Sequence, residues 1–353
     1  MRWEENVRKV EPYVPGEQPG QGGVIKLNTN ENPYPPAPGV RRIAEAFDTD
    51  RLRLYPDTAA QALADALCGY YGIKPEQLFI GVGSDDVLAM SFLTYFNSKK
   101  PVLFPDITYS FYDVWAELYR IPYERKPLDE EFRIVKEDYM AENGGIIIPN
   151  PNAPTGVFED VSVMEEIIAA NPHSVVIVDE AYVDFGGESC LKLIDKYDNL
   201  LVVQTFSKSR SMAGLRIGFA MGNPVLIGYL KDAKFSFNSY TMNMPSIEFG
   251  AEAVKDEEYF KNTVNRIIAT RERMKKELAE LGFSFPNSKS NFLFVSHEMA
   301  PAKRIFEELK KRNIYVRYWA KPRIDNYLRI TVGTDEEADI LVKNLKEIIS
   351  EVS

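Results

Sequence analysis

Short apolar runs that end in polar residues recur along this chain. The clearest are 175–178, which is followed by Asp179, and 201–203, which is followed by Ser207 and Lys208. Continuous apolar runs of this length predict the buried strands of a parallel sheet. We therefore expect an α/β fold in which these polar side chains stand at the carboxyl edge of the sheet, where such folds bind ligands.

The rest of the pattern predicts strands and helices in alternation. Strands are expected at 78–80, 102–104, 146–148, 291–295, 314–317 and 327–332, and helices at 39–48, 58–71, 86–96, 160–170, within 246–281 and after 333. Ser84 is a candidate N-cap, and Thr334 and Glu337 have the spacing of a capping box. Residues 1–24 are rich in proline and glycine, which predicts an irregular arm.

Composition removes several classes of function. The chain has 353 residues and a net charge of −10, so it lacks the basic excess that nucleic-acid binding requires. Cys68 and Cys190 do not make a disulfide framework. His173 and His297 are the only histidines, which leaves little for a metal site or a Ser-His-Asp triad. With no apolar run near the roughly 18 residues of a membrane span, and no apolar signal region, we expect a soluble cytoplasmic protein.

Lys208 and Asp179 follow two apolar runs and could flank one ligand. A lysine in such a position is usually a solvated loop residue, but a lysine held at the edge of a buried sheet can form a Schiff base with a carbonyl. Pyridoxal phosphate suits the pair, because its aldehyde requires a lysine and its ring nitrogen requires a carboxylate. Ser207, Arg216 and the turn 83–85 are candidates for binding its phosphate.

Several motifs carry a resemblance to a known family. The chain resembles the fold-type I aminotransferases, and among them the histidinol-phosphate aminotransferases. The matching segments come in the family's order: 27–34 (LNTNENPY), 55–57 (YPD), 81–85 (GVGSD), 150–156 (NPNAPTG), 179–182 (DEAY), 207–208 (SK), 213–216 (AGLR) and 328–333 (LRITVG).

The resemblance implies a fold-type I architecture with pyridoxal 5′-phosphate as cofactor. It implies an N-terminal arm that contributes to the small domain (1–38), a large domain with a mostly parallel central sheet flanked by helices (39–250), and a smaller α/β C-terminal domain (251–353). It also implies a homodimer with shared active sites, in which the arm packs over the active site or the partner subunit.

The resemblance further implies a role for individual residues. The catalytic residues would be Lys208, Asp179 and Tyr182. The cofactor would be bound by Gly83, Ser84, Asp85, Tyr109, Asn152, Asp179, Tyr182, Ser207, Lys208 and Arg216, together with Tyr55 of the other subunit. The substrate would be bound by Arg329, Arg317, Asn28 and Tyr55, and no metal is expected.

Two details of these motifs bear on the site. The family usually has asparagine immediately before Pro-Thr-Gly, where this chain has Ala153, so either Asn152 takes that role or the hydrogen bond to the ring oxygen is absent. Asn28, Asn30 and Asn32 alternate, and in an extended segment they would point to one side.

The activity implied is transamination between L-histidinol phosphate and 2-oxoglutarate, which gives imidazole acetol phosphate and glutamate in histidine biosynthesis. Two alternatives use the same scaffold: an aromatic or other amino-acid aminotransferase, and a threonine-phosphate decarboxylase. A non-enzymatic α/β binding protein is a further alternative, which the presence of Lys208, Asp179 and Arg216 argues against.

Overall fold

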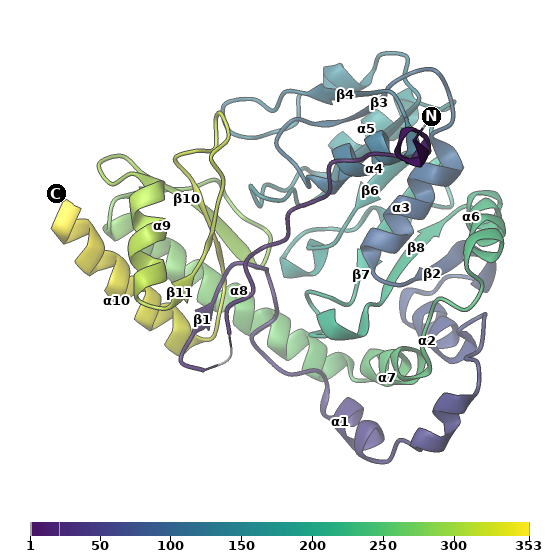
Figure 1. Cartoon of the computed structure of the whole chain (residues 1–353), viewed down its shortest axis with the longest axis horizontal. Coiled ribbons are helices and arrows are strands. Elements are labelled where there is room, and N and C mark those ends of the chain that lie inside the picture. The colour runs from purple at the N-terminus through teal and green to yellow at the C-terminus, as the bar shows by residue number, and fades with distance from the viewer. Residues whose placement is uncertain (1, 21, 353) are drawn as a thin grey trace.

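The computed structural model describes residues 2–20 and 22–352, which form two sheet-containing parts side by side (Figure 1). The larger part is built on a seven-stranded sheet with the order β2-β8-β7-β6-β5-β3-β4. Its strands are β2 (Leu78–Gly81), β3 (Val102–Pro105), β4 (Tyr123–Lys126), β5 (Gly145–Pro149), β6 (Val176–Asp179), β7 (Leu200–Thr205) and β8 (Gly218–Gly222). All neighbours pair in parallel except β8, which is antiparallel to both β2 and β7.

This topology brings chemistry to one edge of the sheet. Because β8 reverses direction between β2 and β7, those two strands run the same way as β3 to β6, and their carboxyl ends meet at one edge. The start of β8 lies at the same edge, since Gly218 pairs with both Gly81 and Thr205. The mostly parallel sheet predicted from the apolar runs is therefore confirmed.

Alternating strand residues pack against helices on opposite faces, as the two-residue period of a strand requires. Ile177 and Leu201 face a cluster covered by α3 (Ser84–Tyr95), α4 (Phe111–Tyr119) and α6 (Pro224–Phe237). Val178 and Val202 face a second cluster covered by α1 (Pro38–Glu45), α2 (Gln61–Tyr71), α5 (Val161–Ala170) and α7 (Met244–Lys255). Both faces of the central strands are thus buried, which explains why β5, β6 and β7 read as continuous apolar runs, whereas the edge strand β4 is partly exposed.

The smaller part holds an antiparallel sheet with the order β12-β13-β10-β9. Its strands are β9 (Phe283–Ser284), β10 (Phe292–His297), β12 (Arg317–Tyr318) and β13 (Leu328–Thr331), and its helices are α8 (Glu257–Glu280), α9 (Ala302–Lys311) and α10 (Asp335–Val352). The predicted capping box before α10 is present: the Thr334 amide donates to Glu337 Oε2 at 2.8 Å, and the Glu337 amide donates to Thr334 Oγ1 at 3.2 Å.

The predicted strand 314–317 is wrong as a single element. It is divided at Val316 into β11 (Ile314–Tyr315), which pairs in parallel with β1 (Ile25–Lys26), and β12, which pairs with β13. The N-terminal segment supplies β1, a partner from the far end of the chain that no local pattern reveals. This change of sheet has a consequence for the site, because it places Arg317 next to β13.

Some predicted ends also differ. The helix expected from residue 58 begins at Gln61, after Ala60 in a left-handed conformation. Ser84 is the first helical residue of α3 and Gly83 is its N-cap, so Ser84 offers its backbone amide rather than a capping hydroxyl. Short 3₁₀ helices join the main elements: η1 (Trp3–Asn6), η2 (Thr49–Arg53), η3 (Pro75–Gln77), η4 (Lys136–Tyr139), η5 (Val183–Phe185), η6 (Cys190–Leu193) and η7 (Ala213–Leu215).

The packing of α7 and α8 locates the division between the two parts. Ala253 and Val254 of α7 belong to the core of the seven-stranded sheet, whereas Phe260 and Val264 of α8 belong to the core of the smaller sheet. A boundary at 250 would divide α7, so we propose that the large domain ends near Asp256.

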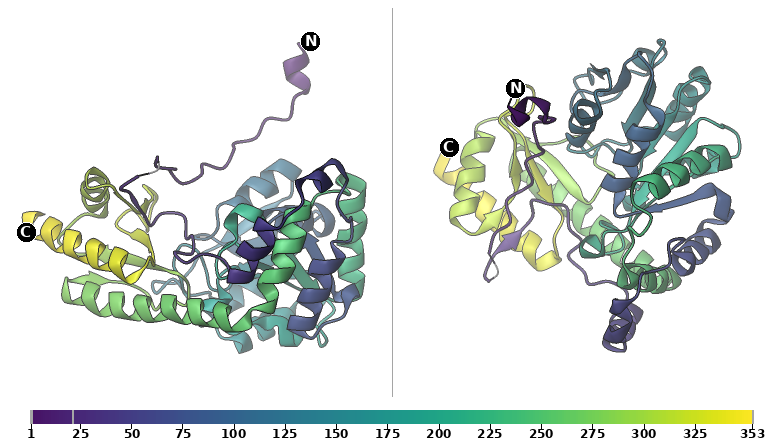
Figure 2. Two further views of the ribbon diagram at one scale, coloured as in Figure 1. Left: turned by 90° about the horizontal axis from the view of Figure 1, so that it is seen from below. Right: turned by 45° about the vertical axis from the view of Figure 1, so that its right-hand side comes forward.

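The arm passes from β1 across to α4 and ends beyond the body of the protein (Figure 2). The ring of Tyr13 stacks on Phe111 with centroids 4.2 Å apart, and Arg8 donates to the carbonyl of Leu118. No helix within residues 2–20 and 22–352 is long and apolar enough to cross a membrane.

Candidate active site

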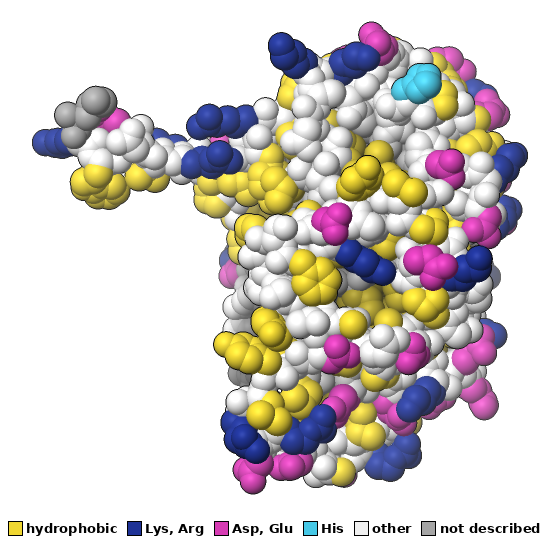
Figure 3. All heavy atoms as spheres, turned by 90° about the vertical axis from the view of Figure 1, so that its right-hand side faces the viewer, with side chains coloured by type: hydrophobic (Ala, Val, Ile, Leu, Met, Phe, Trp, Pro, Cys, Tyr) yellow, Lys and Arg dark blue, Asp and Glu magenta, His cyan; other side chains and the backbone are white. Residues whose placement is uncertain are grey.

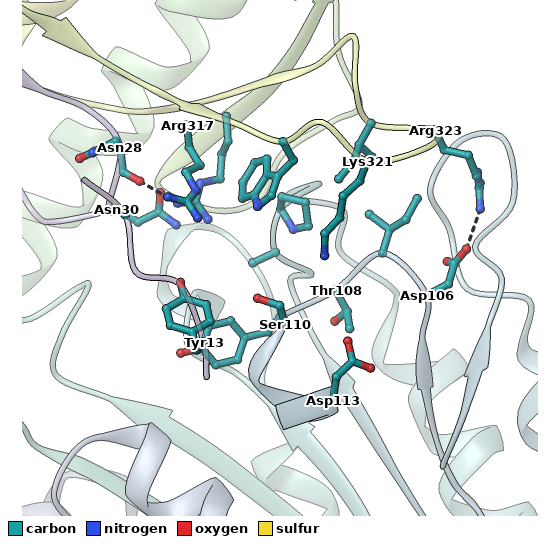
Figure 4. A pocket seen from close by; sticks show the side chains of 18 of the residues that line it. Tyr13, Asn28, Asn30, Asp106, Thr108, Ser110, Asp113, Arg317, Lys321 and Arg323 are labelled. Carbon is teal, nitrogen blue, oxygen red and sulfur yellow. Dashed lines mark hydrogen bonds and ion pairs between the residues drawn. The ribbon is translucent and has the colours of Figure 1, made fainter. Parts of the chain in front are cut away.

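Two adjoining cavities lie where the large sheet faces the small one. The smaller, of about 170 Å³, is at the carboxyl edge of the seven-stranded sheet. The larger, of about 390 Å³, extends toward the small sheet and the arm (Figure 4). Both are lined by the same five residues at their junction: Thr29, Tyr109, Ala153, Tyr182 and Lys208.

Lys208 and Asp179 come together in the smaller cavity, as the order of the apolar runs predicted. β6 and β7 are parallel neighbours, so Asp179 at the end of β6 lies beside the segment that carries Lys208 beyond β7. The Lys208 amine donates to the carbonyl of Thr29 at 3.2 Å, and it lies 5.8 Å from the centroid of the Tyr182 ring. A primary amine and a carboxylate therefore line one small cavity.

Asp179 is a buried carboxylate with two hydrogen-bond donors. Its Oδ2 accepts from the Tyr112 hydroxyl at 2.8 Å, and its Oδ1 accepts from the Ala181 amide at 3.2 Å. Burial raises the pKa of Asp179 to about 6, while these two hydrogen bonds act in the opposite direction. A cationic N–H donor in this cavity would find a fixed, desolvated acceptor.

The opposite end of the smaller cavity suits an anion. The amide-bearing first turn of α3 lies there with Arg216 and Ser207. Gly83 has φ +86°, and a Cβ on it would lie 2.5 Å from Arg216 Nη2. A Cβ on Gly218 would lie 2.3 Å from the backbone nitrogen of Ser84. Glycine at both positions lets the turn, the guanidinium and the strand approach one another closely.

Asp85 lies at this anion-binding end, and its charge is compensated within the chain. Its Oδ2 accepts from Arg216 Nη2 at 3.1 Å and its Oδ1 accepts from the Tyr109 hydroxyl at 2.7 Å. Desolvation and the neighbouring Asp85 carboxylate raise the pKa of Tyr109, which keeps this hydroxyl a donor. Asp85 therefore orients Arg216 and Tyr109 along the wall of the cavity.

Tyr182 stands at the junction of the cavities. Its hydroxyl accepts from Asn30 Nδ2 at 2.9 Å, and its ring packs edge-on against Phe292 of β10. Asn30 is itself fixed by Thr331, whose Oγ1 accepts from the backbone amide of Asn30 at 3.0 Å. The small sheet thus positions a hydroxyl beside Lys208.

The larger cavity is dominated by two arginines on neighbouring strands. Arg317 of β12 and Arg329 of β13 are direct partners in the antiparallel register, which places both side chains on one face of the sheet. Both guanidinium carbons lie over Trp319, at 5.4 Å and 5.3 Å from the ring centroid. Among the described residues neither arginine has a carboxylate partner, so this pair is an unneutralised positive site.

Arg329 is the more deeply placed of the two. Its Nη2 donates to the carbonyl of Asn28 at 2.9 Å, while its buried Nε has no hydrogen-bond partner among the described residues. Burial lowers the pKa of Arg329. Arg317 donates to the carbonyls of Pro15 and Val14 in the arm, at 3.5 Å and 3.4 Å. Figure 4 shows Arg317 and Lys321 on one side of the cavity, opposite Ser110 and Asp113.

The structure does not bring every predicted residue to the cavities. Asn152 lines neither, because its amide nitrogen donates to Ile107 O and Thr155 Oγ1, and its oxygen accepts from Thr108 Oγ1. Ala153 occupies the lining position instead. This arrangement favours the alternative in which the hydrogen bond of the family's usual asparagine is absent.

The three alternating asparagines do not share one side. Asn30 has φ +56°, so the segment is not extended there, and each amide has a different partner. Asn28 Nδ2 donates to Glu17 O in the arm, and Asn32 Nδ2 donates to Lys208 O. Asn28 therefore contacts the site through its backbone carbonyl, which accepts from Arg329, and its side-chain amide nitrogen donates to the arm instead.

Tyr55 lies outside the cavities of its own chain. The residue is 80% exposed, and its ring packs on Tyr240 with centroids 4.5 Å apart. Its predicted role belongs to the site of another subunit and stays a prediction.

Several residues at the site were missed by the sequence reasoning. Tyr112 bonds to Asp179, and Tyr13 and Trp319 line the larger cavity. Asn30 was named only as one of the alternating asparagines, without its bond to Tyr182. Tyr112 had a visible signal, because it follows Tyr109 by three residues at the start of a helix. Within residues 2–20 and 22–352, no group of three or more His, Cys, Asp or Glu side chains could hold a metal ion.

Comparison with known proteins agrees with this geometry. Residues 22–345 match the family described as aminotransferase class I and II. The chain belongs to this family. It is 51% identical to a histidinol-phosphate aminotransferase of Lactococcus lactis subsp. cremoris over 349 residues, which cover 99% of this chain and 98% of the relative. It is also 51% identical to a histidinol-phosphate aminotransferase of Clostridium acetobutylicum, with 99% of both chains covered.

Solved structures share the fold of this aminotransferase. A histidinol-phosphate aminotransferase from Sinorhizobium meliloti in complex with pyridoxal 5′-phosphate superposes with a TM-score of 0.85 at 22% identity, over 93% of this chain and 92% of that one. An L-threonine-O-3-phosphate decarboxylase from Porphyromonas gingivalis superposes with a TM-score of 0.80 at 18% identity, over 93% of this chain and 100% of that one. The fold-type I architecture is therefore confirmed, and the fold alone does not separate the two reactions.

Proposed function

We propose that the protein transfers the amino group of L-histidinol phosphate to 2-oxoglutarate with pyridoxal 5′-phosphate as cofactor, as the printed names of its 51% identical relatives suggest. The observation that carries the proposal is the unneutralised Arg317–Arg329 pair, which lies in a cavity that also contains the Lys208 amine. A phosphorylated amine has the two groups that such a cavity would bind at its two ends. Arginine binds phosphate and carboxylate bidentately, so one pair can serve both the donor and the keto acid.

The smaller cavity fits the cofactor by the chemistry of its walls. Gly83 and Gly218 leave room for Arg216 to lie against the first turn of α3, which forms an anion site. At the other end Asp179 is a buried acceptor suited to a ring N–H, and Lys208 lies between these ends with Tyr182. Pyridoxal phosphate supplies an aldehyde that takes up an amine and a ring that accommodates negative charge.

Each residue would then have a defined task. Lys208 Nζ would anchor the aldehyde until the substrate amine replaces it, and the freed Nζ would then move the α-proton of the substrate as base and acid. Asp179 keeps the ring nitrogen protonated. Ser84, Ser207 and Arg216 hold the phosphate of the cofactor, while the Tyr109 ring forms one wall. Arg329, with Arg317, orients the anionic end of the substrate.

A half-reaction tests the substrate. Cofactor-loaded protein mixed with L-histidinol phosphate, without a keto acid, should form about one equivalent of imidazole acetol phosphate and stop until 2-oxoglutarate is added. Glutamate should then appear in equal amount. Phosphothreonine should release no carbon dioxide and phenylalanine should react far more slowly. Turnover of another amine, with histidinol phosphate inert, would contradict the substrate and leave the aminotransferase assignment standing.

We further propose that two copies complete each other's active sites. Several large apolar side chains are exposed on two segments that meet where Tyr55 packs on Tyr240: Leu52, Leu54, Tyr55, Phe237 and Tyr240. Figure 3 shows hydrophobic side chains on the face that carries α6 and along the base of the arm. Tyr55 lies outside the cavities of its own chain. If this surface packed against a second copy, Tyr55 would contribute to the active site of that copy. The cytoplasmic location expected from the sequence stays a prediction.

Mixing two inactive variants tests the sharing. Lys208→Ala and Tyr55→Ala proteins, unfolded together and refolded, should regain activity, because one site in each mixed dimer has both native residues. Light scattering should give twice the chain mass. A monomer, or mixtures no more active than their components, would argue against shared sites.

A further inference from the structure

Tyr112 is buried beneath the smaller cavity and contacts two of its lining residues, Asp179 and Tyr109. Its side chain is fully buried on α4, and its hydroxyl donates to Asp179 Oδ2 at 2.8 Å. Tyr112 does not line either cavity itself. Among the described residues the hydroxyl bonds only to Asp179, so its influence on the cavity passes through that carboxylate.

Aromatic neighbours fix the ring that carries this hydroxyl. The ring of Tyr112 lies 5.8 Å from Phe104, 6.3 Å from Phe92 and 6.2 Å from Trp115, measured between centroids. Tyr109 meets it edge-on at 5.7 Å, and the backbone amide of Tyr112 donates to Tyr109 O at 3.2 Å. A ring packed on several sides holds its hydroxyl in one place, because rotation would require the neighbours to move.

The hydroxyl also decides which electron pairs of Asp179 remain available. Each oxygen of the carboxylate already has one donor, Tyr112 on Oδ2 and the Ala181 amide on Oδ1. A carboxylate has about four acceptor positions. The two that remain on Asp179 point away from the Tyr112 hydroxyl and the Ala181 amide. Without the hydroxyl, the carboxylate is held by the Ala181 amide alone among the described residues.

The raised pKa of Asp179 adds a second effect. Burial favours its neutral form, and the Tyr112 hydrogen bond is the largest opposing influence on its pKa. A neutral Asp179 would accept a ring N–H less strongly than a carboxylate does. The hydroxyl thus favours both the orientation and the charge that a cationic donor requires.

We propose that Tyr112 is a positioning residue that holds Asp179 ionised and aimed at the ring nitrogen of the cofactor. The inference rests on the proposed role of Asp179. A buried tyrosine outside the cavity would then determine how strongly the protein binds one atom of the ligand, the ring nitrogen. Losing the hydroxyl should therefore weaken recognition of that atom and leave recognition of the phosphate and the aldehyde unchanged.

The experiment compares two ligands that differ at that atom. Cofactor-free protein is titrated with pyridoxal phosphate and with its 1-deaza analogue, in which C–H replaces the ring nitrogen. The ratio of the two dissociation constants measures recognition of the nitrogen alone. We expect the wild type to favour pyridoxal phosphate by at least about tenfold, which is the scale of a charge-assisted hydrogen bond. Tyr112→Phe should reduce this ratio by about threefold or more.

A matched variant controls for the loss of a buried hydroxyl. Tyr95 is a partly buried tyrosine whose hydroxyl donates to the backbone carbonyl of Leu226 at 2.8 Å, and it lines neither cavity. Tyr95→Phe should leave the ratio at its wild-type value. Equal weakening of both ligands by Tyr112→Phe, with the ratio unchanged, would overturn the inference, because a merely loosened cavity would act on both alike.

Two further results separate this inference from the proposal beneath it. A wild-type ratio near one would mean that Asp179 does not recognise the nitrogen, and both claims would fall. A high wild-type ratio that Asp179→Asn removes and Tyr112→Phe preserves would overturn the role of Tyr112 alone. If Tyr112→Phe does not fold, 3-fluorotyrosine at position 112 keeps the ring and the hydroxyl. Its fluorine NMR signal should shift more with pyridoxal phosphate than with the analogue, and equal shifts would overturn the inference.

Discussion

The two walls of the active site differ in how their charges are neutralised. At the edge of the large sheet, Arg216 is paired with Asp85, and Asp179 is held by hydrogen bonds from Tyr112 and Ala181. At the edge of the small sheet, Arg317 and Arg329 face each other across neighbouring strands, with no carboxylate partner among the described residues. One wall is complete without a ligand, and the other has unsatisfied charge.

This difference suits the two ligands, because the cofactor stays bound while the substrate exchanges in every cycle. A cofactor that stays bound gains from a preorganised wall, since little must rearrange when it enters. A substrate that exchanges twice in each cycle must supply the anion that the second wall lacks. Like charges directly opposite in a sheet are destabilising, so the arginine pair is expected to lower the stability of the free protein in return for binding.

Lys208 lines both cavities, and its loss should have the largest effect. We expect Lys208→Ala to lower kcat for histidinol phosphate by at least about 10³-fold, because the amine serves as both anchor and proton carrier. Lys234 is a suitable control: it is a buried lysine that donates to Ile80 O at 3.3 Å, and it lines neither cavity. Lys234→Met should keep most of the activity. Turnover of Lys208→Ala near the wild-type rate would contradict the assignment.

Arg329→Met tests the unneutralised wall. We expect kcat/KM for histidinol phosphate to fall about 10²-fold, the scale of losing a bidentate charged contact. The melting temperature of the ligand-free variant should not fall, because a desolvated guanidinium with an unpartnered Nε is replaced by an apolar side chain. Steady-state kinetics and thermal unfolding measure the two effects. A less stable variant with unchanged kcat/KM would mean that Arg329 is a structural residue.

Arg216→Met applies the same substitution to the neutralised wall. We expect the dissociation constant for pyridoxal phosphate to rise about tenfold, because one charged contact to the phosphate is lost. Stability without cofactor should change little, since the Arg216–Asp85 pair is partly exposed. At saturating cofactor the KM for histidinol phosphate should stay near the wild-type value. A change in KM as large as that caused by Arg329→Met would remove the distinction between the walls.

The sequence predicted the neutralised wall better than the other. Lys208 and Asp179 follow continuous apolar runs, and the rule that parallel strands end at one edge was enough to bring them together. Arg317 and Arg329 were named as substrate residues, but their direct pairing was not predicted, because the expected strand 314–317 is divided at Val316 between a pairing with β1 and a pairing with β13. Local patterns cannot supply such a partner.

Side-chain partners were the least predictable part. The amide of Asn152 is occupied by Ile107, 45 residues away in sequence, so its neighbours in the motif gave no indication of its role. Tyr112 lies 67 residues from Asp179, and only the packing of α4 on the sheet brings the two together. Roles that depend on such contacts require the fold to be known first.

Glu180 offers the smallest test, immediately behind the neutralised wall. Its buried carboxylate accepts from Ser189 Oγ at 2.6 Å, from the Cys190 amide at 2.6 Å and from Gln204 Nε2 at 2.8 Å. Burial nevertheless raises the pKa of Glu180 from 4.5 to about 7. Between these two pH values the folded protein binds more protons at this site than the unfolded chain. Its contribution to stability is therefore fully present below about pH 4.5 and decreases as the pH rises to about 7.

Glu180→Gln removes this titration and keeps the shape of the side chain. The wild type should lose up to about 3 kcal/mol of unfolding free energy relative to the variant between pH 5 and pH 8, which follows from 1.36 kcal/mol per pKa unit. Denaturant unfolding of both proteins at several pH values measures the difference, in which the titration of Asp179 and of surface groups cancels. Parallel stability curves would show that the hydrogen bonds to Glu180 outweigh its burial, and that the carboxylate behind the wall is ionised throughout this range.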